Sequence, residues 1–277
     1  MTEDRADRQY EFYPQQYTRF GSDISAEIRR EVYGEDLGQL GWRTLDEQAQ
    51  IAELCSRSSP CHVLDVACGS GGPSLALVAS TGCTLTGIDI EASAIAQAQR
   101  LASERGFSEK ARFLTLDCRN ALPFENDAFD VVVCIDAVLH LGDRFAILAD
   151  WSRLLRPGGL LLFTDAAVLT GAISKDEFEI RASQGGFLLV PPGLNETAVA
   201  AAGLVLQRCD DRTRATADLA TRLHVARERR SSELAKTEGL EWFSQRQNFL
   251  AVTAELASSS RLSRFFYIVE KPAIAHV

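Results

Sequence analysis

One short stretch constrains the fold of this chain more than any other: an apolar run that leads directly into a glycine-rich turn. It reads His-Val-Leu-Asp-Val-Ala-Cys-Gly-Ser-Gly-Gly-Pro at positions 62–73. The apolar half predicts a buried strand. The turn carries few side chains, so its backbone N–H groups can approach a ligand closely, as in loops that bind nucleosides and nucleotides.

A second apolar run, residues 84–89, ends in Asp89, 18 residues beyond Gly71. An acid at the end of the second strand is placed to accept hydrogen bonds from both ribose hydroxyls. Alternatively, Asp89 only caps the helix expected from residue 91. Because the glycine turn lies upstream, we favour ribose binding, with Ile90 against one face of the base.

The spacing of the glycines distinguishes between two candidate ligands. A dinucleotide-binding loop has a third glycine where this chain has Ser74, after Gly69 and Gly71. Asp65, inside the strand end, is no part of that fingerprint. A nicotinamide-dependent oxidoreductase is therefore the less favoured alternative.

Strands and helices alternate from residue 62 onward. The predicted strands are 62–66, 84–89, 112–116, 129–135 and 160–164, and the predicted helices are 74–80, 91–105 and 143–155, the last ended by Pro-Gly-Gly at 157–159. This regular alternation indicates right-handed βαβ units and a doubly wound α/β sheet.

The alternation of strands and helices ends near residue 166. Residues 166–195 show no regular pattern of apolar residues. Beyond them, the pattern predicts a short helix at 195–202, a strand at 203–208, two or three helices within 213–258 and a last strand at 264–270. Before the sheet, Thr44 and Glu47 form a capping box that opens a helix through about residue 55.

Charge and composition argue against several classes of binding partner. The net charge of −9 argues against nucleic acid, no apolar run reaches the ~18 residues of a membrane span, and the charged N-terminus is no secretory signal. Seven cysteines without a Cys-x-x-Cys pair, together with scattered histidines, predict neither a metal site nor disulfides. These features favour a cytoplasmic protein with a small-molecule partner and no membrane contact.

The pattern Asp65-x-x-x-Gly69-x-Gly71 resembles motif I of the Rossmann-like (class I) S-adenosylmethionine-dependent methyltransferases. Ala67 stands where the usual first glycine does, and its methyl group is tolerable if φ stays negative. Two further blocks, 129–144 and 154–159, complete the methyltransferase pattern over about residues 62–165.

Segments 32–42, 72–74 and 136–144 are similar to those of sarcosine/dimethylglycine and phosphoethanolamine N-methyltransferases. The resemblance implies S-adenosyl-L-methionine as cofactor and methyl transfer to a small molecule, with an amine nitrogen favoured. Oxygen or carbon acceptors, and a scaffold that keeps the fold without turnover, stay open as alternatives.

The resemblance also implies a seven-stranded, mostly parallel sheet whose last strand is antiparallel. Residues 1–57 would form an N-terminal helical segment and 58–168 the cofactor-binding core. Residues 169–277 would supply lid helices over the acceptor and the last two strands.

The resemblance then implies the roles of individual residues. Asp117 would receive the adenine amino group and Cys118 would offer its N–H to a ring nitrogen. His140, after the fourth strand, is the candidate general base, oriented by Asp136 or by Tyr17; alternatively it only shapes the turn or the pocket. The candidate cofactor-binding residues are Asp65, Ala67, Gly69, Gly71, Asp89, Ile90, Asp117, Cys118 and Asp136, and the candidate catalytic residues are His140 and Tyr17.

Two features of the helical stretch have simpler interpretations. The cluster Arg222, Arg227, Arg229 and Arg230 is interspersed with glutamates, which favours a solvated helix face over a clamp for an acidic acceptor. The aromatic spacing that includes Phe249 favours helix packing over a cage for a cation.

Overall fold

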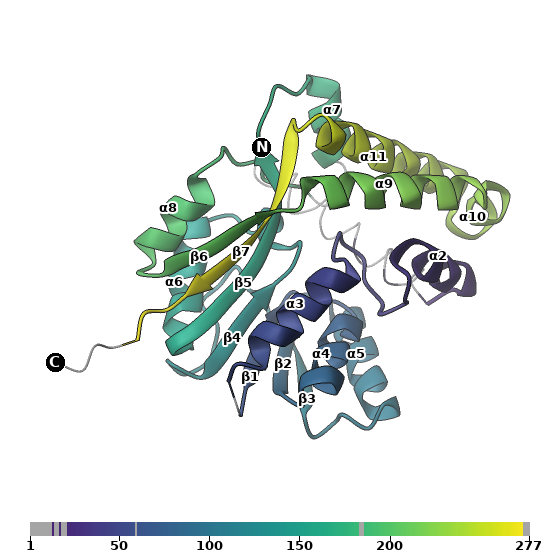
Figure 1. Cartoon of the computed structure of the whole chain (residues 1–277). Helices are drawn as coiled ribbons and strands as arrows, with labels where there is room; N and C mark the ends of the chain where they lie inside the picture. Colours follow the sequence, from purple (N-terminus) through teal and green to yellow (C-terminus); the bar gives the residue numbers. More distant parts are fainter. Residues whose placement is uncertain (1–12, 14–16, 18–20, 59, 183–185, 274–277) are drawn as a thin grey trace.

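A computed structural model describes residues 13, 17, 21–58, 60–182 and 186–273 of the 277-residue chain. Its centre is a seven-stranded sheet in the order β3-β2-β1-β4-β5-β7-β6 (Figure 1). The first five strands run parallel, and β7 is antiparallel to both of its neighbours. The predicted fold class, including the antiparallel last strand, is confirmed.

The strands lie close to their predicted positions, except that β5 is much longer than the sequence indicated. Their bounds are β1 (His62–Val66), β2 (Thr84–Asp89), β3 (Ala111–Thr115), β4 (Phe129–Cys134), β5 (Leu155–Leu169), β6 (Val205–Asp211) and β7 (Leu262–Glu270).

The early start of β5 comes from a bulge. Leu155 already pairs with Phe129, and the register shifts before the regular pairing resumes. Gly158 adopts a φ of 81°, and a Cβ on Gly159 would lie 2.9 Å from the carbonyl oxygen of Asp130. The Pro-Gly-Gly sequence therefore follows the preceding helix, as predicted, but lies inside the strand that was expected to begin after it.

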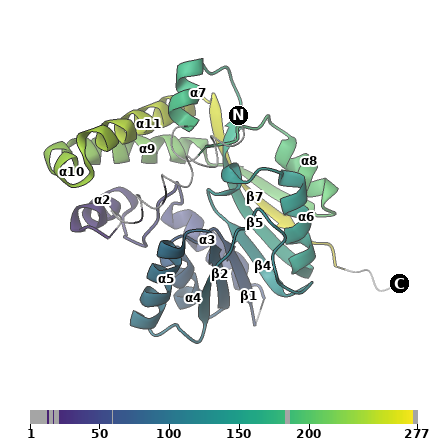
Figure 2. The same cartoon turned by 180° about the vertical axis from the view of Figure 1, so that it is seen from behind.

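Helices cover both faces of the sheet, as the two views show (Figures 1 and 2). One apolar cluster joins the sheet to α3, α4 and α5, and another joins it to α6 and α8. These helices are α3 (Leu45–Cys55), α4 (Gly72–Thr81), α5 (Ala92–Glu104), α6 (Arg144–Leu154) and α8 (Leu194–Ala201). The capping box predicted for Thr44 and Glu47 is present at the start of α3.

A third apolar cluster lies beyond the carboxyl ends of the parallel strands, where helices from both ends of the chain pack together. They are α2 (Asp23–Tyr33), α7 (Lys175–Ala182), α9 (Thr213–Glu228), α10 (Ser231–Glu238) and α11 (Leu240–Ser258). Stretch 213–258 thus holds three helices, inserted between β6 and β7 as predicted. No helix in the described ranges is both long and apolar enough to cross a membrane.

The turn between β1 and α4 departs from expectation at Ala67. Its φ is +57°, the left-handed region, whereas the sequence analysis required a negative value. The left-handed conformation costs a residue with a Cβ about 1–2 kcal/mol. Gly69 and Gly71 share this conformation, and at Gly71 space is also limiting, because a Cβ would lie 2.7 Å from that of Ala98.

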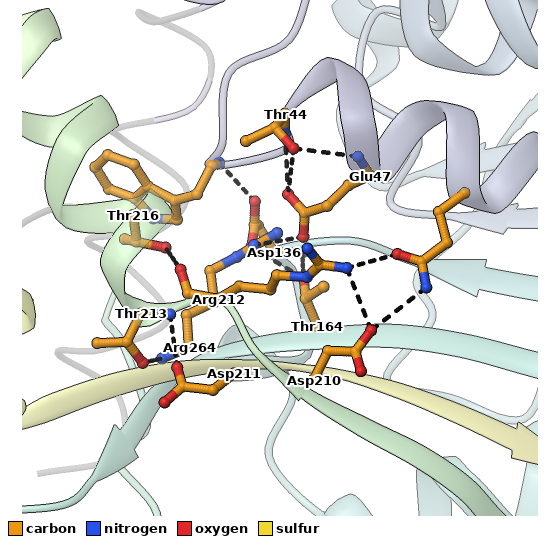
Figure 3. Close-up of polar contacts among 12 residues, drawn as sticks. Thr44, Glu47, Asp136, Thr164, Asp210, Asp211, Arg212, Thr213, Thr216 and Arg264 are labelled. Carbon is orange, nitrogen blue, oxygen red and sulfur yellow. Dashed lines mark hydrogen bonds and ion pairs between the residues drawn. The ribbon is translucent and has the colours of Figure 1, made fainter.

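Arg264 on β7 links the sheet to the start of α3 through a buried network of ion pairs and hydrogen bonds. It is 1% exposed, and its guanidinium donates to Asp136 and to Glu47, each at 2.7 Å (Figure 3). Asp136 also accepts hydrogen bonds from the N–H of Trp42 at 2.6 Å and from the hydroxyl of Thr164 at 2.9 Å. One buried network therefore joins the start of α3, the end of β4, β5 and β7.

Replacing Arg264 with methionine leaves two buried carboxylates without their cation. We expect the free energy of unfolding, measured by urea denaturation, to fall by about 3–5 kcal/mol. The matched control is Arg156→Met, which breaks an ion pair with Asp130 in which the arginine side chain is 47% exposed. The control should cost only about 0–1 kcal/mol.

Comparing wild type and Arg264→Met at different pH values gives a second test of the network. Burial raises the pKa of Asp136, but the charge of Arg264 and the hydrogen bonds from Arg264, Trp42 and Thr164 together outweigh burial and lower the pKa below its usual value. The stabilisation is therefore present above a pH of about 4 and is lost as the pH falls through the lowered pKa. The stability gap between wild type and Arg264→Met should narrow in acid; a constant gap would mean that Arg264 acts by packing alone.

Ala67→Gly removes the left-handed strain at the turn. We expect the free energy of unfolding to rise by up to about 1 kcal/mol, since greater flexibility of the unfolded chain offsets part of the relief. Gly71→Ala is the contrasting variant and should lose about 2–4 kcal/mol. Thermal unfolding of both variants measures these changes in stability. A destabilised Ala67→Gly protein would show that the left-handed conformation of Ala67 is not strained.

Candidate functional site

A cavity of about 210 Å³ lies at the carboxyl ends of β1 to β4, beneath the helices of the third apolar cluster. The loops after these strands supply one half of its wall. The N-terminal tyrosines, the loop before α3, α7 and α11 supply the other half. The wall residues used below are Tyr13, Tyr17, Gly41, Trp42, Arg43, Ala67, Gly69, Asp89, Ile90, Asp117, Cys118, Arg119, Asp136, His140, Arg181, Phe187, Arg246 and Phe249.

Asp89 borders the cavity and also shapes it. Its carboxylate accepts hydrogen bonds from the N–H of Gly69 and the N–H of Glu91, each at 2.9 Å. Burial raises its pKa, and these N–H bonds oppose the rise. The N-cap of α5 is Glu91, so Asp89 does not cap this helix, and its carboxylate together with the neighbouring Ile90 faces the cavity. Ribose binding stays a prediction.

Asp65 and Gly71, both expected to bind the cofactor, do not line the cavity. Asp65 is 4% exposed and accepts a hydrogen bond of 2.6 Å from the hydroxyl of Ser74. This bond holds α4 against β1 beneath the glycine turn. The serine that replaces a third glycine and the acid that precedes the turn are therefore partners, and both support the loop from below.

Asp117 and Cys118 line the cavity as expected, but Asp117 already has a cationic partner. The guanidinium of Arg119 donates to both carboxylate oxygens, at 2.9 and 2.8 Å, and these bonds lower the pKa of Asp117. Recognition of adenine by Asp117 stays a prediction.

Asp136 lines the cavity, but its side chain serves a different purpose from the one predicted. The carboxylate is held by Arg264, Trp42 and Thr164 among the described residues, so it does not orient His140. Its φ of 56° turns the chain at the end of β4 and sends the next residues along the cavity wall.

The tyrosine that contacts His140 is Tyr13, and Tyr17 was the wrong choice for this contact. The hydroxyl of Tyr13 lies 2.7 Å from Nε2 of His140. Burial raises the pKa of Tyr13, so the hydroxyl keeps its proton at neutral pH. Tyr17 lies instead over the glycine turn, where a Cβ on Gly69 would be 2.7 Å from its hydroxyl oxygen. Tyr13 and Tyr17 are only four residues apart in the chain, and the sequence alone could not say which ring reaches His140.

Two cavity residues, Arg181 and Arg246, had no signal in the sequence analysis. Arg181 lies over the rings of Phe187 and Phe249, 4.6 and 4.8 Å from their centroids, and Arg246 lies 5.1 Å from that of Phe249. Burial lowers the pKa of Arg181 to about 9 and that of Arg246 to about 10. Phe249 packs in the helical cluster, as predicted, and also lines the cavity. The cluster Arg222–230 does not line it.

Comparison with known proteins agrees with this geometry. Residues 63–159 match the family model of a methyltransferase domain. Methyltransferase GfsG of Streptomyces halstedii is 32% identical over 134 residues, which cover 48% of this chain and 47% of that protein. O-methyltransferase resE of Aspergillus sclerotiorum is 31% identical over 155 residues, covering 54% of this chain and 58% of that protein. The chain thus spans about half the length of these curated relatives.

Among solved structures, phosphoethanolamine N-methyltransferase 2 of Haemonchus contortus is similar, with a TM-score of 0.75 and 16% sequence identity. The alignment covers 95% of this chain and 60% of that one, and at this identity it demonstrates the shared fold. The family match favours S-adenosylmethionine over a dinucleotide as the ligand of the glycine turn. Residues 63–159 of this chain thus match a methyltransferase domain.

Proposed function

We propose that this protein transfers a methyl group from S-adenosylmethionine to a small-molecule acceptor. An amine nitrogen is the favoured acceptor atom, and oxygen or carbon is the alternative. One observation carries the proposal: the glycine turn with Asp89 and the partly buried Tyr13–His140 pair border the same cavity. A cofactor bound at the glycine turn would face an acceptor held at the Tyr13–His140 pair.

The residues around the glycine turn fit S-adenosylmethionine. Gly69 has a φ of 57° and lines the cavity, and the hydroxyl of Tyr17 lies close to it, where a Cβ would be only 2.7 Å from that oxygen. Asp89 offers a carboxylate for the ribose, while Ile90 and Cys118 offer apolar surface for the base. When bound, S-adenosylmethionine supplies a methyl group on a positively charged sulfur, and the acceptor's lone pair takes it as the carbon–sulfur bond breaks.

In this proposal His140 receives the proton that the acceptor loses, and Tyr13 holds the imidazole ring in place. The hydrogen bond between Tyr13 and His140 and the edge contact of His140 with Phe187, at 4.8 Å between ring centroids, restrict the ring. A pair of this kind suits a hydroxyl acceptor as well as an amine, which keeps the oxygen alternative open.

We also propose that residues 58–168 form the cofactor-binding unit. Residues 1–57 and the helices within 169–277 would then form a lid over the acceptor. The packing of α2 against α9, and of α7 against α11, supports this division. Such a lid would exclude water from the reacting atoms and align them.

A screen of small amines, alcohols and carbon acids with purified protein and S-adenosylmethionine tests the function. We expect formation of S-adenosylhomocysteine together with the mass of one added methyl group in an amine. Transfer to a hydroxyl or a carbon would select an alternative acceptor atom. Absence of S-adenosylhomocysteine binding by the purified protein would contradict the proposal.

Asp89→Asn tests the ribose assignment. Loss of a charged acceptor should weaken S-adenosylhomocysteine binding, measured by calorimetry, by about 2–3 kcal/mol, which is roughly 30- to 150-fold. The amide oxygen can still accept one of the two N–H bonds, so we expect the variant to fold. Asp46→Asn, an exposed change on α3, is the control and should bind normally. Equal affinity in both variants would refute the assignment.

His140→Ala should lower kcat by ~10²-fold and flatten the acidic limb of the pH–rate profile, because the proton acceptor is gone. Tyr13→Phe should lower kcat less and keep that limb, since His140 remains and loses its hydrogen bond with Tyr13. Tyr17→Phe is the matched comparison, because its hydroxyl lies at the glycine turn, and it should affect cofactor affinity more than kcat. An unchanged acidic limb in an active His140→Ala protein would exclude His140 as the base.

A further inference from the structure

Arg181 is a buried cation whose hydrogen-bonding capacity is largely unused. The residue is 1% exposed. Its Nη2 donates to the carbonyl oxygen of Ala166 at 3.3 Å, while Nε and Nη1 have no acceptor among the residues that the structure describes. No carboxylate of the described residues forms an ion pair with Arg181. A guanidinium buried in this state costs several kcal/mol, so an acceptor from outside the chain is the natural complement.

The surroundings of Arg181 concentrate positive charge. Arg246 approaches the same ring, that of Phe249, and its charge contributes to the lowered pKa of Arg181. The two carboxylates whose charges act on Arg181 are already paired, since Asp136 pairs with Arg264 and Asp165 pairs with Arg144 at 2.9 Å. Contact with aromatic faces stabilises a cation only in part and leaves its in-plane N–H groups unsatisfied.

Arg181 belongs to the acceptor side of the cavity. Its guanidinium and the ring of His140 contact the same residue, Phe187, with separations from the Phe187 centroid of 4.6 and 4.8 Å. A small molecule can therefore reach both groups. The opposite side, at the glycine turn, has a cation of its own, Arg43, whose charge acts on Asp65.

We infer that Arg181, with Arg246 beside it, binds an oxyanion of the methyl acceptor, so that the acceptor is a small organic anion. This inference rests on the proposed function and specifies its substrate class. A carboxylate suits the site, because charge-assisted N–H bonds to carboxylate oxygens are the strong interactions that an arginine makes. An amine, a hydroxyl or a carbon elsewhere in the same molecule would lie at His140.

Calorimetric titration with two matched pairs of probes, benzoate with benzamide and acetate with acetamide, tests the inference. The titrations use protein saturated with S-adenosylhomocysteine, so that the carboxylate of the cofactor is already bound. We expect at least one of the two anions to bind about tenfold or more tightly than its neutral isostere. Arg181→Met should abolish this preference, and Arg181→Lys should retain part of it. S-adenosylhomocysteine affinity should change less than about twofold in either variant.

Arg112→Met is the matched control, because Arg112 also lies over a phenylalanine ring, 6.0 Å from the centroid of Phe124, but is exposed and does not line the cavity. It should keep the anion preference, which excludes an effect of net charge. If Arg181→Met does not fold, Arg246→Met and Arg181→Lys replace it and should reduce the preference.

Three results would overturn the inference. The first is that the wild type prefers neither anion over its neutral isostere. The second is that Arg181→Met keeps the full preference. The third is that Arg181→Met loses tenfold or more of its affinity for S-adenosylhomocysteine. The last result would assign the guanidinium to the cofactor. Failure of the wild type to bind S-adenosylhomocysteine at all would instead contradict the proposed function, so the two failures are distinguishable.

Discussion

The ion network around Arg264 sets the position of the cavity wall. Its three charged members, Glu47, Asp136 and Arg264, are each less than a tenth exposed and come from distant parts of the chain. A buried charge is tolerated only when its partners are in place, so the network favours a single arrangement of these segments. It also brings the loop before α3 against the end of β4. There a Cβ on Gly41 would lie 2.5 Å from a carboxylate oxygen of Asp136, so the contact leaves room only for glycine.

With that wall in place, the cavity has two chemically different sides. The side at the glycine turn presents the carboxylate of Asp89, which ties the turn to the end of β2, and the Asp117–Arg119 ion pair. The lid side presents aromatic rings and the guanidinium groups of Arg181 and Arg246. His140 lies at the lid side, beside Phe187. An anionic acceptor on the second side would complement the charge of these two guanidinium groups.

The sheet could be predicted because its signals are local. A strand buried on both faces reads as a continuous apolar run, and a glycine turn or a capping box is visible within a few residues. Departures occurred where a contact from elsewhere in the fold changed the local preference. Ala67 adopts a left-handed φ within a turn that Asp89 and the Ser74–Asp65 bond hold in place. β5 begins early because Leu155 finds a partner in Phe129.

By itself, the sequence determined the doubly wound sheet, the glycine turn, the placement of Asp89 at the end of β2 and that of His140 after β4, because these depend on residues close together in the chain. Only the tertiary structure decided which side chains meet His140, that Asp136 pairs with Arg264, and that Arg181 enters the cavity. Those contacts join residues separated by long stretches of chain. Their geometry depends on how helices pack over the sheet, and a pattern of residue types along one segment carries no information about that packing.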